Sequence, residues 1–140
     1  GLGLAAELAA RELDAFGARL LALRGRLEEG LRAAVPDLVV HGAAAPRLPN
    51  TVCASFPGAR SDRLLGELEA RGVEVSGGAA CASGRVEPSP VLTAMGVPRE
   101  LAVCALRFSA GRTTTEAEVD AVVAATGEAV RAVRAAGDGR

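Results

Sequence analysis

The sequence predicts an α+β fold in which a small, mostly antiparallel sheet carries helices on one face. Segments with apolar residues at helical spacing lie near both ends of the chain, and shorter segments between them alternate apolar with polar residues. A chain of 140 residues can bury a real core, roughly two thirds of its unfolded surface. This order of elements predicts helices packed on one layer of sheet.

Leucine and phenylalanine recur every three to five residues between Leu4 and Ala34, which predicts a long amphipathic helix. Pro36 ends it, because the residue before a proline is disfavoured in helical geometry. Glycines inside the segment each cost up to about 1 kcal/mol relative to alanine, so we expect the helix to bend or to pack against something outside the chain. We therefore assign residues 1–36 to a long helix and residues 37–140 to the folded domain.

Two of the expected strands alternate clearly between apolar and polar residues. Every second residue of 51–56 is apolar, and in 103–109 Leu106 and Phe108 flank Arg107. Successive side chains of a strand point to opposite faces, so one face of the sheet packs on the core. The other face is polar and needs water or a partner domain. It would carry Thr51, Cys53, Ser55, Arg107 and Ser109.

The remaining elements are shorter. Strands are expected at residues 38–41 and 73–76, and helices from Ser61 to Gly72, from Ser89 to Gly96 and from Thr115 to about Ala135. Their ends carry recognisable signals: Ser61 as a cap, glycine at a left-handed cap, proline at a first helical position, and Thr115 with Glu118 as a capping box.

Composition excludes several classes of function. The formal charge of −1, with arginine interleaved among acidic residues, gives no basic face for nucleic acid. Every long uncharged stretch contains Gly, Pro or Ser, so no membrane span is expected. Cys53, Cys81 and Cys104 are odd in number and widely spaced, which indicates a reducing, cytoplasmic setting. With His41 they lack the paired spacing of a zinc site.

The chain contains no lysine, since all 16 residues counted as Lys or Arg are arginine. An internal Schiff base with a carbonyl cofactor is formed by a lysine amine. The polypeptide alone therefore cannot carry out internal-aldimine chemistry.

Cys81 is the first candidate for a chemical role. It lies among the small residues of 77–84, which can neither pack a core nor hold one conformation well. A thiol there is exposed and mobile, as a nucleophile must be if it reacts at one site and moves to another. Cys104 shares a face with Leu106 and is interpreted as a core residue, and Cys53 as structural.

Arg107 is the second candidate. Its guanidinium lies opposite the apolar residues of its strand and is suited to a bidentate grip on a carboxylate. A salt bridge to Glu87 or Asp62 is an equal alternative from the residues alone. Asn50 begins a strand and can make a turn hydrogen bond, and His41 is interpreted as a surface residue at a strand end.

Four ordered motifs resemble the carboxy-terminal part of the cysteine desulfurases, the pyridoxal-phosphate enzymes of the class V aminotransferase family. They are Arg47-Leu-Pro-Asn-Thr, Val75-Ser-Gly-Gly-Ala-Ala-Cys-Ala-Ser-Gly, Glu87-Pro-Ser-Pro-Val-Leu-Thr-Ala-Met-Gly and Leu106-Arg-Phe-Ser-Ala-Gly-Arg-Thr-Thr-Thr. Residues 1–9 also resemble the family segment that leads from the large domain into a long connecting helix. The resemblance covers nearly the whole chain and implies the fold of the small domain of fold-type I pyridoxal-phosphate enzymes.

The resemblance also implies roles for the candidates. Cys81 matches the catalytic cysteine, which takes sulfur from L-cysteine to leave L-alanine and a persulfide. Arg107 matches the arginine that holds the substrate carboxylate, and Asn50, grouped with it as substrate-binding, matches a motif position near the active site. The cofactor lysine, the stacking histidine and the paired aspartate of the family have no match, and His41 is not that histidine. Residues 37–140 are therefore interpreted as the small domain without its large domain, inactive alone and holding no pyridoxal phosphate covalently.

The resemblance further implies a homodimeric complete enzyme and a sulfur-acceptor protein, in iron–sulfur cluster assembly or tRNA thiolation. Two alternatives remain. The chain could be a standalone module that accepts a persulfide on Cys81 without cofactor chemistry. It could also be the small domain of a class V aminotransferase that acts on another amino acid, in which the loop around Cys81 would have no role.

Overall fold

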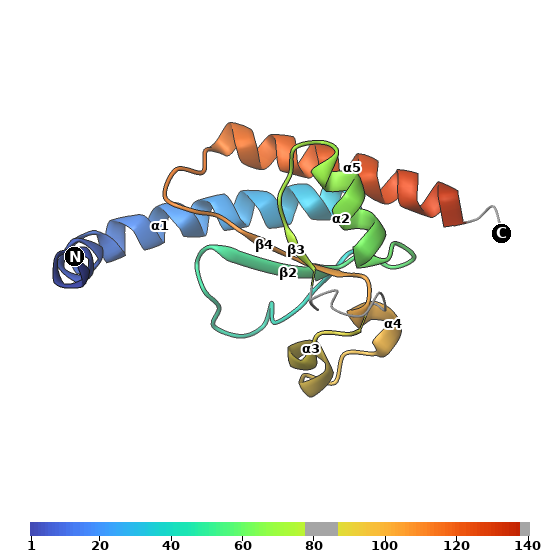
Figure 1. Cartoon of the computed structure of the whole chain (residues 1–140), viewed down its shortest axis with the longest axis horizontal. Coiled ribbons are helices and arrows are strands. Elements are labelled where there is room, and N and C mark those ends of the chain that lie inside the picture. The colour runs from blue at the N-terminus through green and yellow to red at the C-terminus, as the bar shows by residue number, and fades with distance from the viewer. Residues whose placement is uncertain (78–86, 138–140) are drawn as a thin grey trace.

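Helices and strands form two main layers, as the sequence predicts. The computed structural model describes residues 1–77 and 87–137. Within these residues, α1 (Leu2–Ala34), α2 (Ser61–Glu69) and α5 (Glu116–Gly137) lie on one side of a sheet (Figure 1). Its strands are β1 (Val39–Val40), β2 (Thr51–Ser55), β3 (Ser76–Gly77) and β4 (Ala105–Ser109). They are ordered β1-β2-β4-β3 with antiparallel neighbours, so the predicted α+β fold is confirmed.

The core forms where the apolar face of β2 and β4 meets the helices. Val52 is paired with Phe108 and Ala54 with Leu106, and all four side chains are buried. Phe56 packs edge-on against Phe108, with ring centroids 6.2 Å apart. Leucines of α1 and α2 and valines of α5 close this core from the other side. They include Leu20, Leu23, Leu27, Leu31, Leu64, Leu68, Val119, Val130 and Val133.

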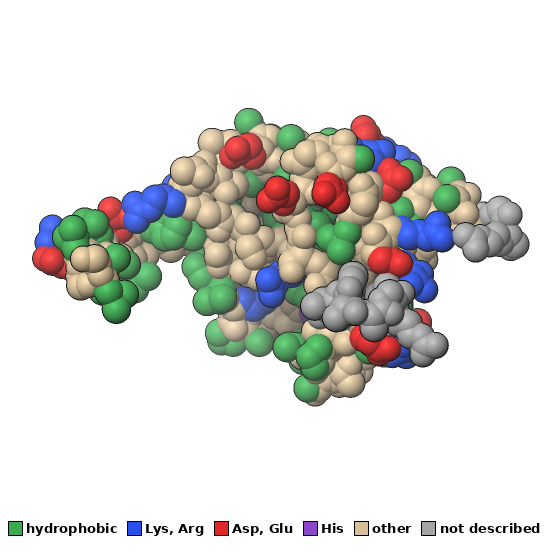
Figure 2. Space-filling model, in the orientation of Figure 1, with side chains coloured by type: hydrophobic (Ala, Val, Ile, Leu, Met, Phe, Trp, Pro, Cys, Tyr) green, Lys and Arg blue, Asp and Glu red, His purple; other side chains and the backbone are tan. Residues whose placement is uncertain are grey.

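The stripe predicted along α1 is buried only in its second half. Leu2 and Leu13 are 87% and 65% exposed, and Leu4 and Leu8 are also exposed. These first turns extend beyond the sheet and α5, at the left of Figure 1. Figure 2 shows hydrophobic side chains gathered on this projecting part. The predicted helix is thus confirmed, although half of its apolar face has no cover among the described residues.

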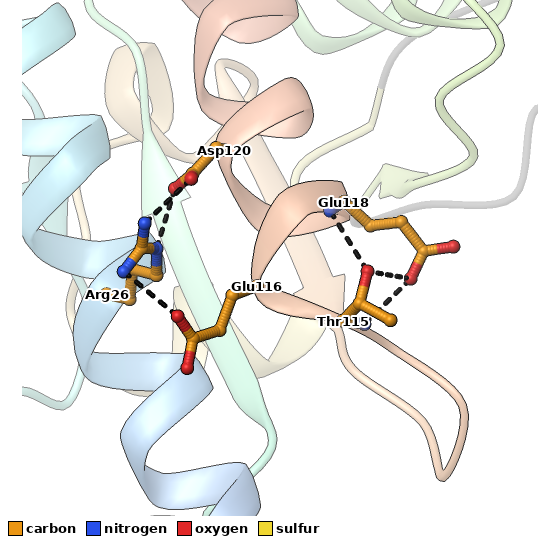
Figure 3. A network of polar contacts seen from close by, with 5 residues as sticks. All are labelled: Arg26, Thr115, Glu116, Glu118 and Asp120. Atoms are coloured by element: carbon orange, nitrogen blue, oxygen red, sulfur yellow. Dashed lines mark hydrogen bonds and ion pairs between the residues drawn. The ribbon is translucent and has the colours of Figure 1, made fainter.

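The start of α5 is fixed by two polar arrangements (Figure 3). Arg26 of α1 donates from Nε and Nη2 to the two carboxylate oxygens of Asp120, at 2.6 and 2.7 Å, and its Nη1 contacts Glu116 at 3.3 Å. The Thr115 backbone N–H donates to Glu118 Oε2 at 2.7 Å, and the Glu118 N–H donates to Thr115 Oγ1 at 3.2 Å. The predicted capping box is thereby confirmed.

Several element boundaries differ from the prediction for identifiable reasons. Of the expected strand 73–76, only Ser76 pairs with β4, together with the following Gly77, because Val73 and Val75 pack against the main core instead. Ser61 is the first helical residue rather than a cap, since the helix begins after an extended Arg60. A short helix that was not predicted, α4 (Arg99–Ala102), precedes β4.

The polar face of the sheet is partly covered. The predicted short helix is present as α3 (Pro90–Ala94), and it lies with α4 below the sheet in Figure 1. Leu92, Ala102 and Ala105 form a second, small buried cluster there, against which Cys53 packs. The three larger helices thus occupy the predicted face, and two short helices cover part of the opposite one.

None of the helices within residues 1–77 and 87–137 combines the length and the hydropathy that a bilayer crossing requires.

The glycines of α1 are not equivalent. A Cβ on Gly30 would lie 2.8 and 3.1 Å from the two methyl groups of Val123 in α5, whereas a Cβ on Gly25 would meet nothing within 4 Å. Valine in a helix has one strongly preferred rotamer, so Val123 cannot easily turn away. Gly30 therefore permits the close approach of α1 and α5, which the sequence alone indicated only as a weak point of the helix.

We expect Gly30→Ala to lower the free energy of unfolding by about 1 kcal/mol, because overpacking costs about 1–3 kcal/mol and outweighs the gain in helix propensity. Gly25→Ala is the matched control and is expected to raise it by about 0.5–1 kcal/mol. Urea unfolding followed by circular dichroism measures both. Equal stabilisation by the two substitutions would contradict the close packing at Gly30.

Candidate functional site

Arg107 lies in the middle of β4, on the face that points away from the main core. Its cross-strand partners are Cys53 on β2 and Ser76 on β3. Cross-strand partners project from the same face of a pleated sheet. A thiol, a guanidinium and a hydroxyl group therefore form one row across three strands, which we call the Cys53–Arg107–Ser76 row.

A cavity of about 210 Å³ lies beside this row. The row lines one wall, and residues at the start of α3 line another, namely Ser89, Val91 and Leu92. The apolar cluster around Leu92 seats this helix on the sheet. The cavity thus combines apolar walls with one cation and two hydroxyl groups, which is a composition suited to a small anionic ligand.

The guanidinium of Arg107 is available to such a ligand. The two carboxylates considered as salt-bridge partners contact other arginines, Glu87 with Arg99 at 3.5 Å and Asp62 with Arg60 at 3.2 Å. Among residues 1–77 and 87–137, no acidic side chain forms an ion pair with the exposed Arg107. A planar guanidinium on a paired strand can hold a carboxylate through two parallel hydrogen bonds.

The three cysteines occupy different surroundings. Cys104 is buried, and burial raises the pKa of its thiol. Cys53 is half-buried; burial raises the pKa of its thiol, although the nearby charge of Arg107 opposes the shift. Cys81 lies outside the described residues, and Gly77, the last described residue before it, lines the cavity.

Asn50 is engaged at the opposite end of the strand pair. Its Nδ2 donates to the Ala110 carbonyl at 3.1 Å, and its Oδ1 accepts from Thr51 Oγ1 at 3.1 Å. The register places it three positions from the Cys53–Arg107 pair, a separation of about 10 Å along the strand. The structure therefore does not bring the Asn50 amide together with Arg107.

The sequence did not single out Ser76 or Ser89 as neighbours of Arg107. Strand alternation alone could not pair Ser76 with Arg107, because that pairing depends on a register between distant segments. Ser55 was expected on the open polar face, yet it is fully buried. Its Oγ lies 2.7 Å from His41 Nε2 and 2.7 Å from the Leu101 carbonyl oxygen. Burial lowers the pKa of His41.

Known proteins are similar to this chain in sequence and in fold. The cysteine desulfurase IscS of Anaeromyxobacter sp. strain Fw109-5 is 46% identical over 134 residues, which are 96% of this chain and 33% of the relative. A cysteine desulfurase of Cereibacter sphaeroides is 48% identical over 120 residues, 86% of this chain and 30% of the relative. The chain thus spans about a third of the length of these relatives.

A solved structure gives the same result for the fold. The NifS-like protein from Rickettsia africae ESF-5 aligns with a TM-score of 0.81 at 26% identity, covering 92% of this chain and 33% of that one. The family model described as aminotransferase class-V matches residues 1–122. This chain therefore belongs to the class V aminotransferase family.

Proposed function

We propose that this chain is the small domain of a cysteine desulfurase, which converts L-cysteine to L-alanine and transfers the sulfur. In this proposal Arg107 holds the substrate carboxylate and Cys81 receives the sulfur. The observation that carries the proposal is the cavity beside the Cys53–Arg107–Ser76 row. There an arginine without a described acidic partner lies next to Gly77, four residues before Cys81. The similarity to cysteine desulfurases supports the same assignment.

Arg107 orients the substrate. A guanidinium fixed on β4 binds both oxygens of a carboxylate and so limits the rotation of the bound amino acid. Hydrogen bonds that involve a charged group contribute about 1.5–3 kcal/mol each. The hydroxyl groups of Ser76 and Ser89 line the same cavity and can accept or donate further hydrogen bonds.

Cys81 acts as the nucleophile. Its thiolate attacks the sulfur of the substrate, so that a sulfur–sulfur bond forms while the bond between that sulfur and the substrate Cβ breaks. The electron pair of the broken bond leaves with the carbon, which takes up a proton and becomes the methyl group of alanine. The sulfur remains on Cys81 as a persulfide and passes to an acceptor protein.

The residues of this chain do not fit a covalently held pyridoxal phosphate, the cofactor of the family. The sequence has no lysine, and a Schiff base with this aldehyde is formed by a lysine amine. We propose that a large domain supplies the cofactor site and that residues 1–36 form the helix leading from it into the domain of residues 37–140. The exposed leucines on the first half of α1 support a covering partner.

The substrate, the oligomeric state and the sulfur acceptor are proposed from the similarity to cysteine desulfurases. We propose L-cysteine as the substrate, a homodimer as the state of the complete enzyme and a separate protein as the sulfur acceptor. Iron–sulfur cluster assembly and tRNA thiolation are the two destinations of sulfur that fit this reaction. Three widely spaced cysteines favour a reducing compartment, and we propose the cytoplasm.

A chimera tests the function. This chain replaces the matching segment of the Anaeromyxobacter cysteine desulfurase, with which it is 46% identical. We expect the chimera to release alanine from L-cysteine and to gain the mass of one sulfur on Cys81. Arg107→Gln should lower kcat/KM by roughly 10- to 100-fold, since a charge-assisted hydrogen bond to the substrate is lost. Cys81→Ser should abolish the gain in mass.

Cys104→Ala is the control, because this buried thiol lies outside the cavity. It should leave the persulfide on Cys81. A chimera that folds and binds pyridoxal phosphate, yet transaminates another amino acid without forming a persulfide, would contradict the desulfurase assignment.

Cys53 can report on the charge that Arg107 places in the cavity. Iodoacetate and iodoacetamide alkylate a thiol by the same displacement of iodide, and they differ in charge. The ratio of their rates at Cys53 cancels the fraction of thiolate. We expect Arg107→Gln to lower this ratio by roughly 3- to 10-fold, the effect of one charge about 4 Å away in the high dielectric of water, because Arg107 is exposed. Peptide mass mapping separates Cys53 from the other thiols.

Arg11→Gln makes the same change of net charge at an exposed position in the first half of α1 and should leave the ratio unaltered. Raising the ionic strength should reduce the effect of Arg107. If Arg107→Gln and Arg11→Gln give the same ratio, Arg107 does not bind carboxylates in this cavity.

A further inference from the structure

Ser55 connects three elements through one buried hydroxyl group. It is the last residue of β2 and is 0% exposed. Its Oγ contacts His41, which directly follows β1, and the carbonyl of Leu101 in α4, each at 2.7 Å. His41 is also tied to β2 by its backbone N–H, which donates to the Cys53 carbonyl at 2.9 Å.

The direction of these hydrogen bonds follows from the protons available. Two oxygen atoms at 2.7 Å require a proton between them, and a carbonyl has none to give. The Ser55 hydroxyl therefore donates to Leu101, and the Nε2–H of His41 donates to Ser55. We call this chain of two hydrogen bonds the His41–Ser55–Leu101 clamp.

The clamp is connected to the wall of the Arg107 cavity through contacts of α4 with α3. Leu101 belongs to α4, and the adjacent Ala102 packs with Leu92 of α3 and with Ala105 in the small cluster below the sheet. Ser89, Val91 and Leu92 in turn form the wall of the cavity that faces the Cys53–Arg107–Ser76 row. Among the described residues, this wall is held by a small apolar cluster, and the segment just after α4 is tied to the main body by backbone hydrogen bonds from Phe56 N–H to the Cys104 carbonyl and from Ser61 N–H to the Val103 carbonyl, each 3.0 Å long. The Ser55 hydroxyl adds a buried polar anchor on α4 itself.

We infer that Ser55 and His41 are positioning residues for the Arg107 cavity: their clamp on Leu101 fixes α4, and α4 fixes α3 over the row. What the cavity binds rests on the proposed function, whereas the clamp does not. Without it, α3 and α4 open more often while the main core of α1, α2 and α5 keeps its packing.

The test compares local with global exchange in the full chain. Ser55→Ala should accelerate amide hydrogen exchange at residues 102–104, whose N–H groups bond within and just after α4, by roughly 10-fold or more relative to the α5 core. It should also raise the rate at which neutral iodoacetamide alkylates Cys53, because Cys53 packs against the cluster that α3 and α4 cover. The Nε2 proton of His41 should lose its protection from exchange in the NMR spectrum.

His41 gives a graded second test that does not alter β2. His41→Ala removes the donor to Ser55 and should reproduce part of the effect. His41→Gln retains an N–H donor of similar reach and should restore most of the parental exchange rates and alkylation rate. This pair keeps the inference testable if Ser55→Ala fails to fold.

Thr126→Val is the matched control, since Thr126 is also fully buried and its Oγ1 donates to the Val122 carbonyl at 2.7 Å within α5. It should leave exchange at residues 102–104 and alkylation of Cys53 unchanged. If Ser55→Ala alters those residues no more than Thr126→Val does, the clamp does not position the cavity wall. Failure of the proposed function gives a different result. In that case, the ratio of iodoacetate to iodoacetamide rates at Cys53 would be the same in the parent chain and in Arg107→Gln.

Discussion

The antiparallel pairing of β2 with β4 determines where the other functional and core side chains lie. Five residue pairs run from Thr51 with Ser109 to Ser55 with Ala105. This register places Val52, Ala54, Leu106 and Phe108 against the helices. A shift of one residue would turn every side chain to the opposite face. The pairing that buries the core thus also sets Arg107 beside Cys53 on the cavity side.

The two faces of this pairing differ in how firmly they are covered. On one face, leucines of α1 and α2 and valines of α5 form a continuous core, and Gly30 lets two of the helices approach closely. On the other, the described residues that hold the two short helices are a small apolar cluster, the buried Ser55 hydroxyl group and backbone hydrogen bonds to Val103 and Cys104. A ligand site on the lightly covered face can adjust without disturbing the core, since regions with few buried contacts open at lower free energy.

Sequence patterns predicted those parts of the structure that depend on local chemistry. The capping box at Thr115, the end of α1 before Pro36 and the exposed guanidinium of Arg107 all follow from neighbours in the chain. Contacts between distant segments could not be read in this way. The pairing of Ser76 with Arg107 and the burial of Ser55 under α4 depend on packing that no local pattern encodes. Gly30 looked unfavourable in isolation because its packing partner, Val123, lies 93 positions away.

Among the described residues, the first turns of α1 make few contacts outside their own helix, and the ion pair between Glu12 and Arg112 is one of them. Isolated helices of this length are marginal in water, so these turns fray readily while Leu4, Leu8 and Leu13 stay exposed. A surface that covers these leucines would bury apolar area and complete the helix in the same step. Such an association would show the negative heat-capacity change of apolar burial, enlarged by coupled folding. Assembly and the final ordering of this helix would then be one thermodynamic event.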